Sequence, residues 1–304
     1  MRFATCAKVA MKRVNDGRLK SELDRVLERY QRADYLDTDP VSVPHQFTDP
    51  LDQEMTAFLA AMMAFGNVRS MLPAIQQSIG WLGSSPVSAL KNCTSLDIEK
   101  ETREFRYRWL KAEDMAAFLG VLKSVYSSGE SLEILFMRGF GSMGEVCGGG
   151  ISSMLAGLRE RLSEEQLQSY GTRYLLPAPG GKGAYKRVHL FLRWMIRHDA
   201  IDLGLWKGVG ASACLIPVDT HVDRISKLLG LTQRSSVDGK MATEITDALR
   251  RLDPADPVKY DFAITRLGIL GACPRRPVHS TCMPCDLRAC CKHWAEVGAS
   301  RAPE

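Results

Sequence analysis

Helical periodicity runs through most of this sequence, and it constrains the fold more than any other feature. Apolar residues recur every three or four positions in long segments, as they do along the buried face of an amphipathic helix. Alternating strand patterns are nearly absent, and residues 104–110 (EFRYRWL) are the one weak match. The sequence therefore predicts an all-α fold of about ten helices. The main segments are 19–36, 49–66, 68–83, 112–126, 149–162, 184–198, 219–230, 238–252 and 257–271.

Length and composition narrow the class of protein further. A chain of 304 residues that is 45% hydrophobic can bury a sizeable core, in one large or two small domains. No window approaches about 18 consecutive apolar residues, so we expect no membrane partner. The first 17 residues are basic but contain no long apolar stretch, which favours a basic arm over residues 1–18 and not a signal peptide. We therefore expect a cytoplasmic monomer.

The segment 215–231 (LIPVDTHVDRISKLLGL) is typical of one amphipathic helix with a clear start and end. Pro217 stops the preceding structure, and Gly230 stands where a helix usually ends. Asp219 occupies the N-cap position, where a carboxylate is worth about 1 kcal/mol. Two interpretations stay open, because Asp219 is either a cap alone or a carboxylate held in place for chemistry.

A Pro- and Gly-rich stretch, residues 175–185 (LLPAPGGKGAY), leads directly into the helix that begins near Lys186. Its glycines permit a close approach of the backbone to a ligand, and the helix N-terminus offers free N–H groups to a phosphate. From Tyr170 to His198 there are six Lys or Arg residues and no Asp or Glu, which indicates an anion-facing surface. Lys186 is a phosphate contact, a solvated lysine or a nucleophilic amine.

Five of the nine cysteines crowd into residues 273–291 (CPRRPVHSTCMPCDLRACC). Cys273, Cys282, Cys285 and Cys291 are separated by eight, two and five residues. Four thiolates from one short loop suit a [4Fe–4S] cluster, and a structural zinc ion is the alternative. Cys290 is the alternative to Cys291 as the fourth ligand.

The order of these features resembles the helix-hairpin-helix DNA glycosylase superfamily. VDTHVDRISKLLGL (218–231) is similar to the segment that carries the family's essential Asp, and KRVHLFLRWM (186–195) to the lysine helix of small 8-oxoguanine glycosylases. DQEMTAFLAAMMAFGNV (52–68) resembles the early helix of the family's helical barrel, and the cysteine segment resembles the iron–sulfur loop of the endonuclease III branch. The chain from residue 39 to residue 271 also resembles an uncharacterised bacterial glycosylase-like family.

The resemblance implies two helical lobes, a helix-hairpin-helix motif and a C-terminal cysteine loop. One lobe covers residues 51–180, and the other combines 19–50 with 181–304. Damaged double-stranded DNA is the implied partner in the bacterial nucleoid, and base-excision repair is the implied process. Lys186 and Asp219 are the implied catalytic residues. The hairpin residues expected to contact DNA are Gly180, Gly181, Gly183 and Arg187.

The hairpin departs from the family pattern in two respects. Glycines usually stand four and two residues before the lysine, but here Lys182 and Ala184 occupy those positions. Alignment on LPAPGGKGA makes Lys182 the nucleophile, whereas the FLRWM sequence that follows favours Lys186. The spacer of 32 residues between Lys186 and Asp219 is longer than usual and resembles that of archaeal 8-oxoguanine glycosylases.

The sequence thus predicts a DNA glycosylase with AP-lyase activity, acting through a lysine Schiff base on a damaged base such as an oxidised purine. The first alternative is a catalytically silent helix-hairpin-helix DNA-binding protein with a structural metal. The second is a metalloprotein that does not bind nucleic acid and whose basic helix contacts an acidic partner.

Overall fold

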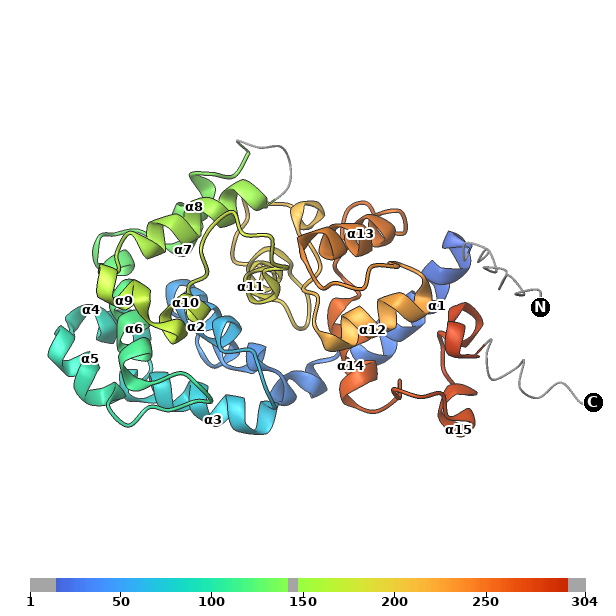
Figure 1. The fold of residues 1–304 in the computed structure, drawn as a ribbon, viewed down its shortest axis with the longest axis horizontal. Helices are drawn as coiled ribbons and strands as arrows, with labels where there is room; N and C mark the ends of the chain where they lie inside the picture. Colours follow the sequence, from blue (N-terminus) through green and yellow to red (C-terminus); the bar gives the residue numbers. More distant parts are fainter. Residues whose placement is uncertain (1–14, 142–146, 295–304) are drawn as a thin grey trace, which may run out of the picture.

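A computed structural model describes residues 15–141 and 147–294 of the chain (Figure 1). Within these ranges the secondary structure is helical, with two isolated β-bridges and no strand, so the predicted all-α fold is confirmed. The α-helices are α1 (Asp16–Tyr30), α2 (Pro50–Met62), α3 (Val68–Ile79), α4 (Pro86–Asn92), α5 (Ser95–Thr102), α6 (Ala112–Ser127), α7 (Leu132–Met137), α8 (Gly148–Arg159), α9 (Glu164–Gln168), α10 (Tyr170–Leu175), α11 (Lys186–Ile196), α12 (Thr220–Leu229), α13 (Gly239–Arg250), α14 (Asp261–Ile269) and α15 (His279–Cys282). Short 3-10 helices cover Ala33–Thr38, Pro40–Ser42, Pro44–Gln46, Gly80–Leu82, Ala211–Ala213 and Arg288–Cys290.

Two predicted elements differ from the structure. The helix expected over residues 19–36 begins at Asp16, behind an Asn15 cap, and ends at Tyr30. Arg32 is extended, with φ −131° and ψ 143°, so the chain resumes only as a 3-10 helix. Of the predicted basic arm 1–18, residues 1–14 lie outside the described residues, and residues 16–18 belong to α1.

The weak strand candidate at 104–110 is a tight turn. Tyr107 and Leu110 form an isolated bridge, and Arg108 between them has a φ of 55°. The Tyr107 hydroxyl donates a hydrogen bond to the carbonyl of Phe65, which holds this turn against the end of α2. The alternation of aromatic and basic residues therefore belongs to a turn that packs on a helix end.

Helix α2 lies at the centre of the core. Asp49 caps it, with Oδ1 accepting from the N–H groups of Leu51 (2.9 Å) and Asp52 (3.1 Å), and Pro50 occupies its first position. Residues 57–63 are completely buried, and α2 packs along α11. In Figure 1, α11 lies near the middle of the molecule, α2 lies with α3–α10 on one side of it, and α1 lies with α12–α15 on the other.

Buried polar groups join α2 to its neighbours. The Glu54 carboxylate, 3% exposed, accepts hydrogen bonds from Tyr126 Oη (2.8 Å) and Trp206 Nε1 (2.9 Å). It also accepts from the N–H groups of Leu132 (2.9 Å) and Glu133 (3.1 Å), the first turn of α7. Helix N-termini favour a carboxylate, so Glu54 stabilises α7 through space instead of from its own segment.

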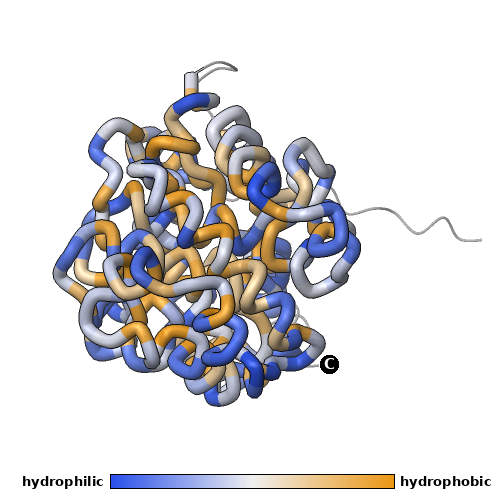
Figure 2. Tube along the Cα trace, turned by 90° about the vertical axis from the view of Figure 1, so that its left-hand side faces the viewer, coloured by the Kyte–Doolittle hydropathy of each residue, from blue (hydrophilic) through white to orange (hydrophobic). Residues whose placement is uncertain are grey.

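Hydrophobic and hydrophilic residues alternate along much of the chain in Figure 2, as expected of amphipathic helices that bury one face. Helix α2 is the exception, because most of its residues are buried. No helix among the described residues is long and apolar enough to cross a membrane.

Candidate active site

The first turn of α11 presents Lys186 beside a glycine-rich loop. The loop follows α10, and Gly180 within it has a φ of 72°, which a residue with a side chain rarely adopts. Gly180, Gly181, Lys182 and Gly183 are all exposed. The predicted glycine-rich loop leading into the Lys186 helix is therefore present, and the short helix α10, which the sequence did not predict, precedes the loop.

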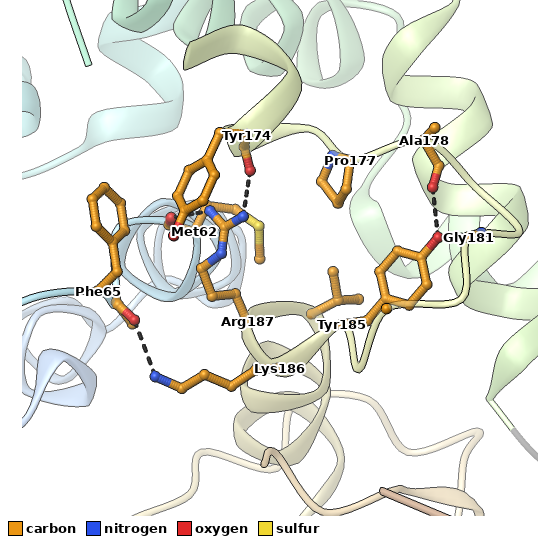
Figure 3. A pocket seen from close by; sticks show the side chains of 12 residues that line it. Met62, Phe65, Tyr174, Pro177, Ala178, Gly181, Tyr185, Lys186 and Arg187 are labelled. Carbon is orange, nitrogen blue, oxygen red and sulfur yellow. Dashed lines mark hydrogen bonds between the residues drawn. The ribbon is translucent and has the colours of Figure 1, made fainter. Parts of the chain in front are cut away.

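The Lys186 side chain is half-buried and lies across the end of α2. Its Nζ donates to the carbonyl of Ala64 at 3.2 Å, within the loop between α2 and α3 (Figure 3). That carbonyl fixes the direction of the amine and brings no opposite charge to it. Lys182 differs, because its side chain is exposed while its carbonyl accepts from the N–H of Gly239 at 3.2 Å.

Asp219 caps α12 with only one of its two carboxylate oxygens. Oδ1 accepts from the N–H groups of His221 (2.8 Å) and Val222 (2.7 Å), which confirms the predicted N-cap. Oδ2 takes no part in the cap. Asp219 is half-buried and lines a cleft of about 890 Å³ together with Lys186. The two predicted catalytic residues thus meet in one cavity, whereas Lys182 does not line it.

A chain of buried charges forms the floor of this cleft. Arg193, 2% exposed, donates from Nη1 to Asp261 and from Nε to Asp202 at 3.1 Å. Burial disfavours the charged guanidinium, but these two carboxylates outweigh it and raise the pKa of Arg193. On the same floor, Arg266 pairs with Asp39.

Asp261 lies next to Asp219 on this floor. Burial raises the pKa of Asp261 to about 7 against the favourable charge of Arg193, and the nearby Asp219 carboxylate adds to the rise. These charged residues were not among the predicted site residues. Arg193 offered a signal, because it interrupts the apolar run FLRWMI on the buried face of α11, where a charge requires partners.

The predicted anion-facing surface is smaller than the stretch 170–198 suggested. Arg193 and Arg197 do not belong to an exposed anion-facing surface, because both are buried, and Arg197 pairs with Asp202 and Asp256. Their carboxylate partners come from outside the acid-free stretch. Arg173 donates to the carbonyls of Leu167 (3.0 Å) and Gln168 (2.6 Å) at the end of α9.

Arg187 also uses its guanidinium within the protein. It donates to the carbonyls of Met62 (2.6 Å) and Tyr174, and it lies 3.9 Å above the centre of the Tyr174 ring (Figure 3). These contacts tie the first turn of α11 to α2 and α10. The predicted contact of Arg187 with DNA would therefore have to be made by a guanidinium that already binds two carbonyl groups.

His221 lies against Gly268 of α14. A Cβ atom at Gly268 would collide with the imidazole ring, so only glycine leaves room for this side chain. Both residues line the cleft beside Asp219. The contact fixes the start of α12 relative to α14, which gives His221 a structural role.

The predicted cysteine ligands follow α14. Burial raises the pKa of Cys285 to about 11, and the nearby thiols of Cys273 and Cys291 add to the rise. Cys291 is likewise close to Cys273 and Cys282. All four predicted ligands are thus neighbours, although no three metal-ligating side chains among the described residues are arranged to hold an ion.

Cys290 has different surroundings from Cys291. Its thiol is buried against Glu22 of α1 and forms a hydrogen bond with the Glu22 side chain. Burial and this hydrogen bond raise the pKa of Cys290 to about 12. Arg224 of α12 donates from Nη1 to the sulfur of Cys273 at 3.1 Å and from Nη2 to its carbonyl at 2.8 Å. Arg224 thus holds the sulfur of Cys273 in place, and four clustered thiols are a donor set that fits an iron–sulfur or zinc centre.

The described chain is an all-α protein in which an amine and a carboxylate from two helix starts line one cleft. It belongs to the family described as "protein of unknown function (DUF2400)", whose model matches residues 39–270. The comparisons with curated proteins and with solved structures found no match. The matched region contains Lys186 and Asp219 and ends before Cys273, so α1 and the cysteine segment lie outside it.

Proposed function

We propose that this protein is a DNA glycosylase with AP-lyase activity that excises a damaged base through a Schiff base on Lys186. The observation that carries the proposal is the meeting of Lys186 and Asp219 in one cleft of about 890 Å³. A volume of this size suits a nucleotide-sized ligand, because small-molecule sites typically measure about 300–1,000 Å³. The resemblance of the lysine and aspartate segments to the glycosylase superfamily supports the same activity.

Chemistry of this kind requires the damaged nucleotide to leave the base stack. Such enzymes rotate the nucleotide out of the duplex into a pocket, at a cost of a few kcal/mol. The exposed glycines of the 178–185 loop and the N-terminus of α11 would hold backbone phosphates, which sets position and not sequence. The resemblance also implies two lobes, and DNA would lie across the cleft between them.

Lys186 would supply the nucleophile. Its unprotonated amine attacks the sugar C1′, and the base departs with the electrons of the glycosidic bond and takes up a proton. Loss of the amine proton and opening of the sugar ring give a Schiff base. Removal of a proton from C2′ then expels the 3′ phosphate, which is the lyase step.

Asp219 would stabilise the positive charge that develops on the sugar as the base departs. Its Oδ1 is occupied by two N–H donors, so the carboxylate is held rigidly while Oδ2 is not used by the cap. A fixed charge of this kind needs no rearrangement during the reaction. Asp219 therefore serves both as the cap of α12 and as an electrostatic catalyst.

The four cysteines Cys273, Cys282, Cys285 and Cys291 would hold a [4Fe–4S] cluster, with zinc as the alternative. The cluster would stabilise the fold of the C-terminal loop, and Arg224 would hold the sulfur of Cys273 in place. Arg275, Arg276 and Arg288 belong to the same loop and would face the DNA backbone.

Borohydride trapping on a panel of lesion-containing duplexes tests the proposal. Borohydride reduces a Schiff base to a stable amine, so the wild-type protein should form a covalent adduct with a duplex that carries its lesion. Lys186→Gln should abolish the adduct and retain DNA binding, and Lys182→Gln should form it. The reverse pattern would make Lys182 the nucleophile, and an adduct with both variants would refute the lysine mechanism.

The catalytically silent DNA-binding protein predicts a different result. It binds duplex DNA with an affinity that falls steeply with salt, yet forms no adduct with any lesion. Binding without an adduct therefore supports this alternative. Absence of binding at low salt would refute both proposals and favour the metalloprotein that does not bind nucleic acid.

A further inference from the structure

Tyr185, the residue immediately before Lys186, has an unusual backbone conformation. Its φ of 42° and ψ of 35° place it in the left-handed region, and Arg108 is the only other non-glycine residue with positive φ in the described chain. Such a conformation costs about 1–2 kcal/mol and persists only where the surroundings enforce it. The contacts of the Tyr185 side chain identify what enforces it here.

The Tyr185 hydroxyl braces the glycine-rich loop from inside. It donates to the carbonyl of Ala178 at 2.6 Å and accepts from the N–H of Gly181 at 2.6 Å (Figure 3). A Cβ atom at Gly181 would lie 2.7 Å from the hydroxyl, so the loop approaches the phenol closely only because that residue is glycine. One side chain thus closes the loop from residue 178 to residue 185.

The backbone of Tyr185 is at the same time the first support of α11. Its carbonyl accepts from the N–H of His189 at 2.9 Å, which begins the hydrogen-bond ladder of the helix. The ring is half-buried and lines a cavity of about 500 Å³ to which Lys186 also contributes. A change in the loop therefore reaches the first turn of α11, and with it Lys186, through Tyr185.

We infer that Tyr185 is a positioning residue that couples the shape of the glycine-rich loop to the placement of the Lys186 amine. The inference rests on the proposed function, because it assigns Lys186 the nucleophilic role. When DNA phosphates occupy the loop, the brace holds the loop and the first turn of α11 in one arrangement. The Lys186 amine is then already oriented toward the sugar before the reaction begins.

Tyr185→Phe is the direct test, because it removes the hydroxyl and keeps the ring. Tyr174→Phe is the matched control, since Tyr174 lines the same cavity and its hydroxyl makes no hydrogen bond within the described residues. Single-turnover adduct formation is measured at saturating protein on a duplex with an abasic site. We expect Tyr185→Phe to lower this rate at least about tenfold, with little change in melting temperature, and Tyr174→Phe to match the wild type.

A second variant removes the brace without leaving the backbone strain in place. Asn tolerates the left-handed region but is too short to reach the loop, so Tyr185→Asn relieves strain and removes the brace together. Its rate of adduct formation should fall as that of Tyr185→Phe does. If Tyr185→Asn traps as fast as the wild type, or if Tyr185→Phe and Tyr174→Phe behave alike, the inference is wrong.

Amide hydrogen exchange of residues 177–185 distinguishes failure of this inference from failure of the proposed function. Without DNA, the Gly181 N–H should exchange about tenfold faster in Tyr185→Phe than in the wild type, because it loses its acceptor. If the wild type forms no adduct, the proposed function fails while exchange still tests the brace. Faster exchange with an unchanged trapping rate would refute the coupling to Lys186, and unchanged exchange would refute the brace itself.

Discussion

At the scale of one residue, Asp219 is the cap of α12, and the proposed function gives it a second, catalytic role. One oxygen satisfies the two N–H groups at the start of α12, and this arrangement fixes where the other oxygen can lie. A sequence pattern identifies the cap but not the second role, because the cleft is formed by segments far apart in the chain. Substitution can separate the two roles.

Asp219→Asn should fold normally and lose base excision. Asn caps a helix about as well as Asp, so the free energy of unfolding should change by less than about 0.5 kcal/mol. A neutral amide cannot stabilise a sugar cation, so the excision rate should fall by about 10²–10³. Asp49→Asn, at the cap of α2, is the control and should retain full activity. Normal activity in Asp219→Asn would leave Asp219 as a cap alone.

His189 links stability to pH. It is buried on α11, and burial lowers its pKa to about 4 from the ordinary value of 6.5. The folded state therefore binds the proton less well than the unfolded chain does. The stability that His189 contributes is present above pH 6.5 and is lost as the pH falls toward 4, by about 1.4 kcal/mol per unit.

Denaturant unfolding at pH 7 and pH 5 measures this contribution. His189→Leu has no ionisable side chain at this position. It should therefore lose less stability between pH 7 and pH 5 than the wild type loses. His198→Gln, at an exposed histidine, should keep the wild-type dependence. Equal pH dependence in His189→Leu and the wild type would mean that His189 does not carry the effect.

At the scale of elements, helical periodicity predicted the long helices and missed the short ones. Each of the nine predicted segments contains an α-helix, because ten or more residues repeat the apolar period several times. Helices α4, α5, α7, α9, α10 and α15 have eight residues or fewer. Their stability depends on distant partners, such as the Glu54 carboxylate at the start of α7, and the local sequence does not contain that information.

The candidate site was predictable to a similar degree. The sequence patterns and the resemblance placed Lys186 and Asp219 at two helix starts, and the structure brings both into one cleft. The buried pairs of Arg193 and Arg266 could not be predicted, because their carboxylate partners come from other segments. The Tyr185 brace was missed because nothing in a short sequence shows which way a phenol turns.

The contact between α12 and α14 gives a test at this scale. Gly268→Ala should destabilise the protein by about 1–3 kcal/mol, because the new methyl group collides with the His221 ring. Gly120→Ala in α6 is the matched control, since a Cβ atom there meets nothing within 4 Å. It should be neutral or stabilise by up to about 1 kcal/mol. Equal unfolding free energies for the two variants would refute the predicted collision.

At the scale of the whole molecule, the proposed metal centre would hold together the segment 273–291. Anaerobically purified protein should be brown, with absorbance near roughly 400 nm and about four irons per chain. Cys291→Ser should lose iron, whereas Cys290→Ser should retain it, because the Cys290 thiol faces Glu22 of α1. A colourless protein with one zinc would support the zinc alternative. Iron loss only in Cys290→Ser would make Cys290 the fourth ligand in place of Cys291.

The packing of α1 against α14 has a consequence for how the chain folds during synthesis. Leu19, Leu23 and Val26 of α1 are buried, and Arg29 pairs with Asp286 at 3.0 Å. These partners leave the ribosome more than 200 residues after α1 does. At a synthesis rate of about 5–20 residues per second, the apolar face of α1 stays exposed for roughly 10–50 s before α14 is made. A nascent chain stalled before residue 261 therefore exposes that face, and chaperones that bind apolar helices should select such chains over completed ones.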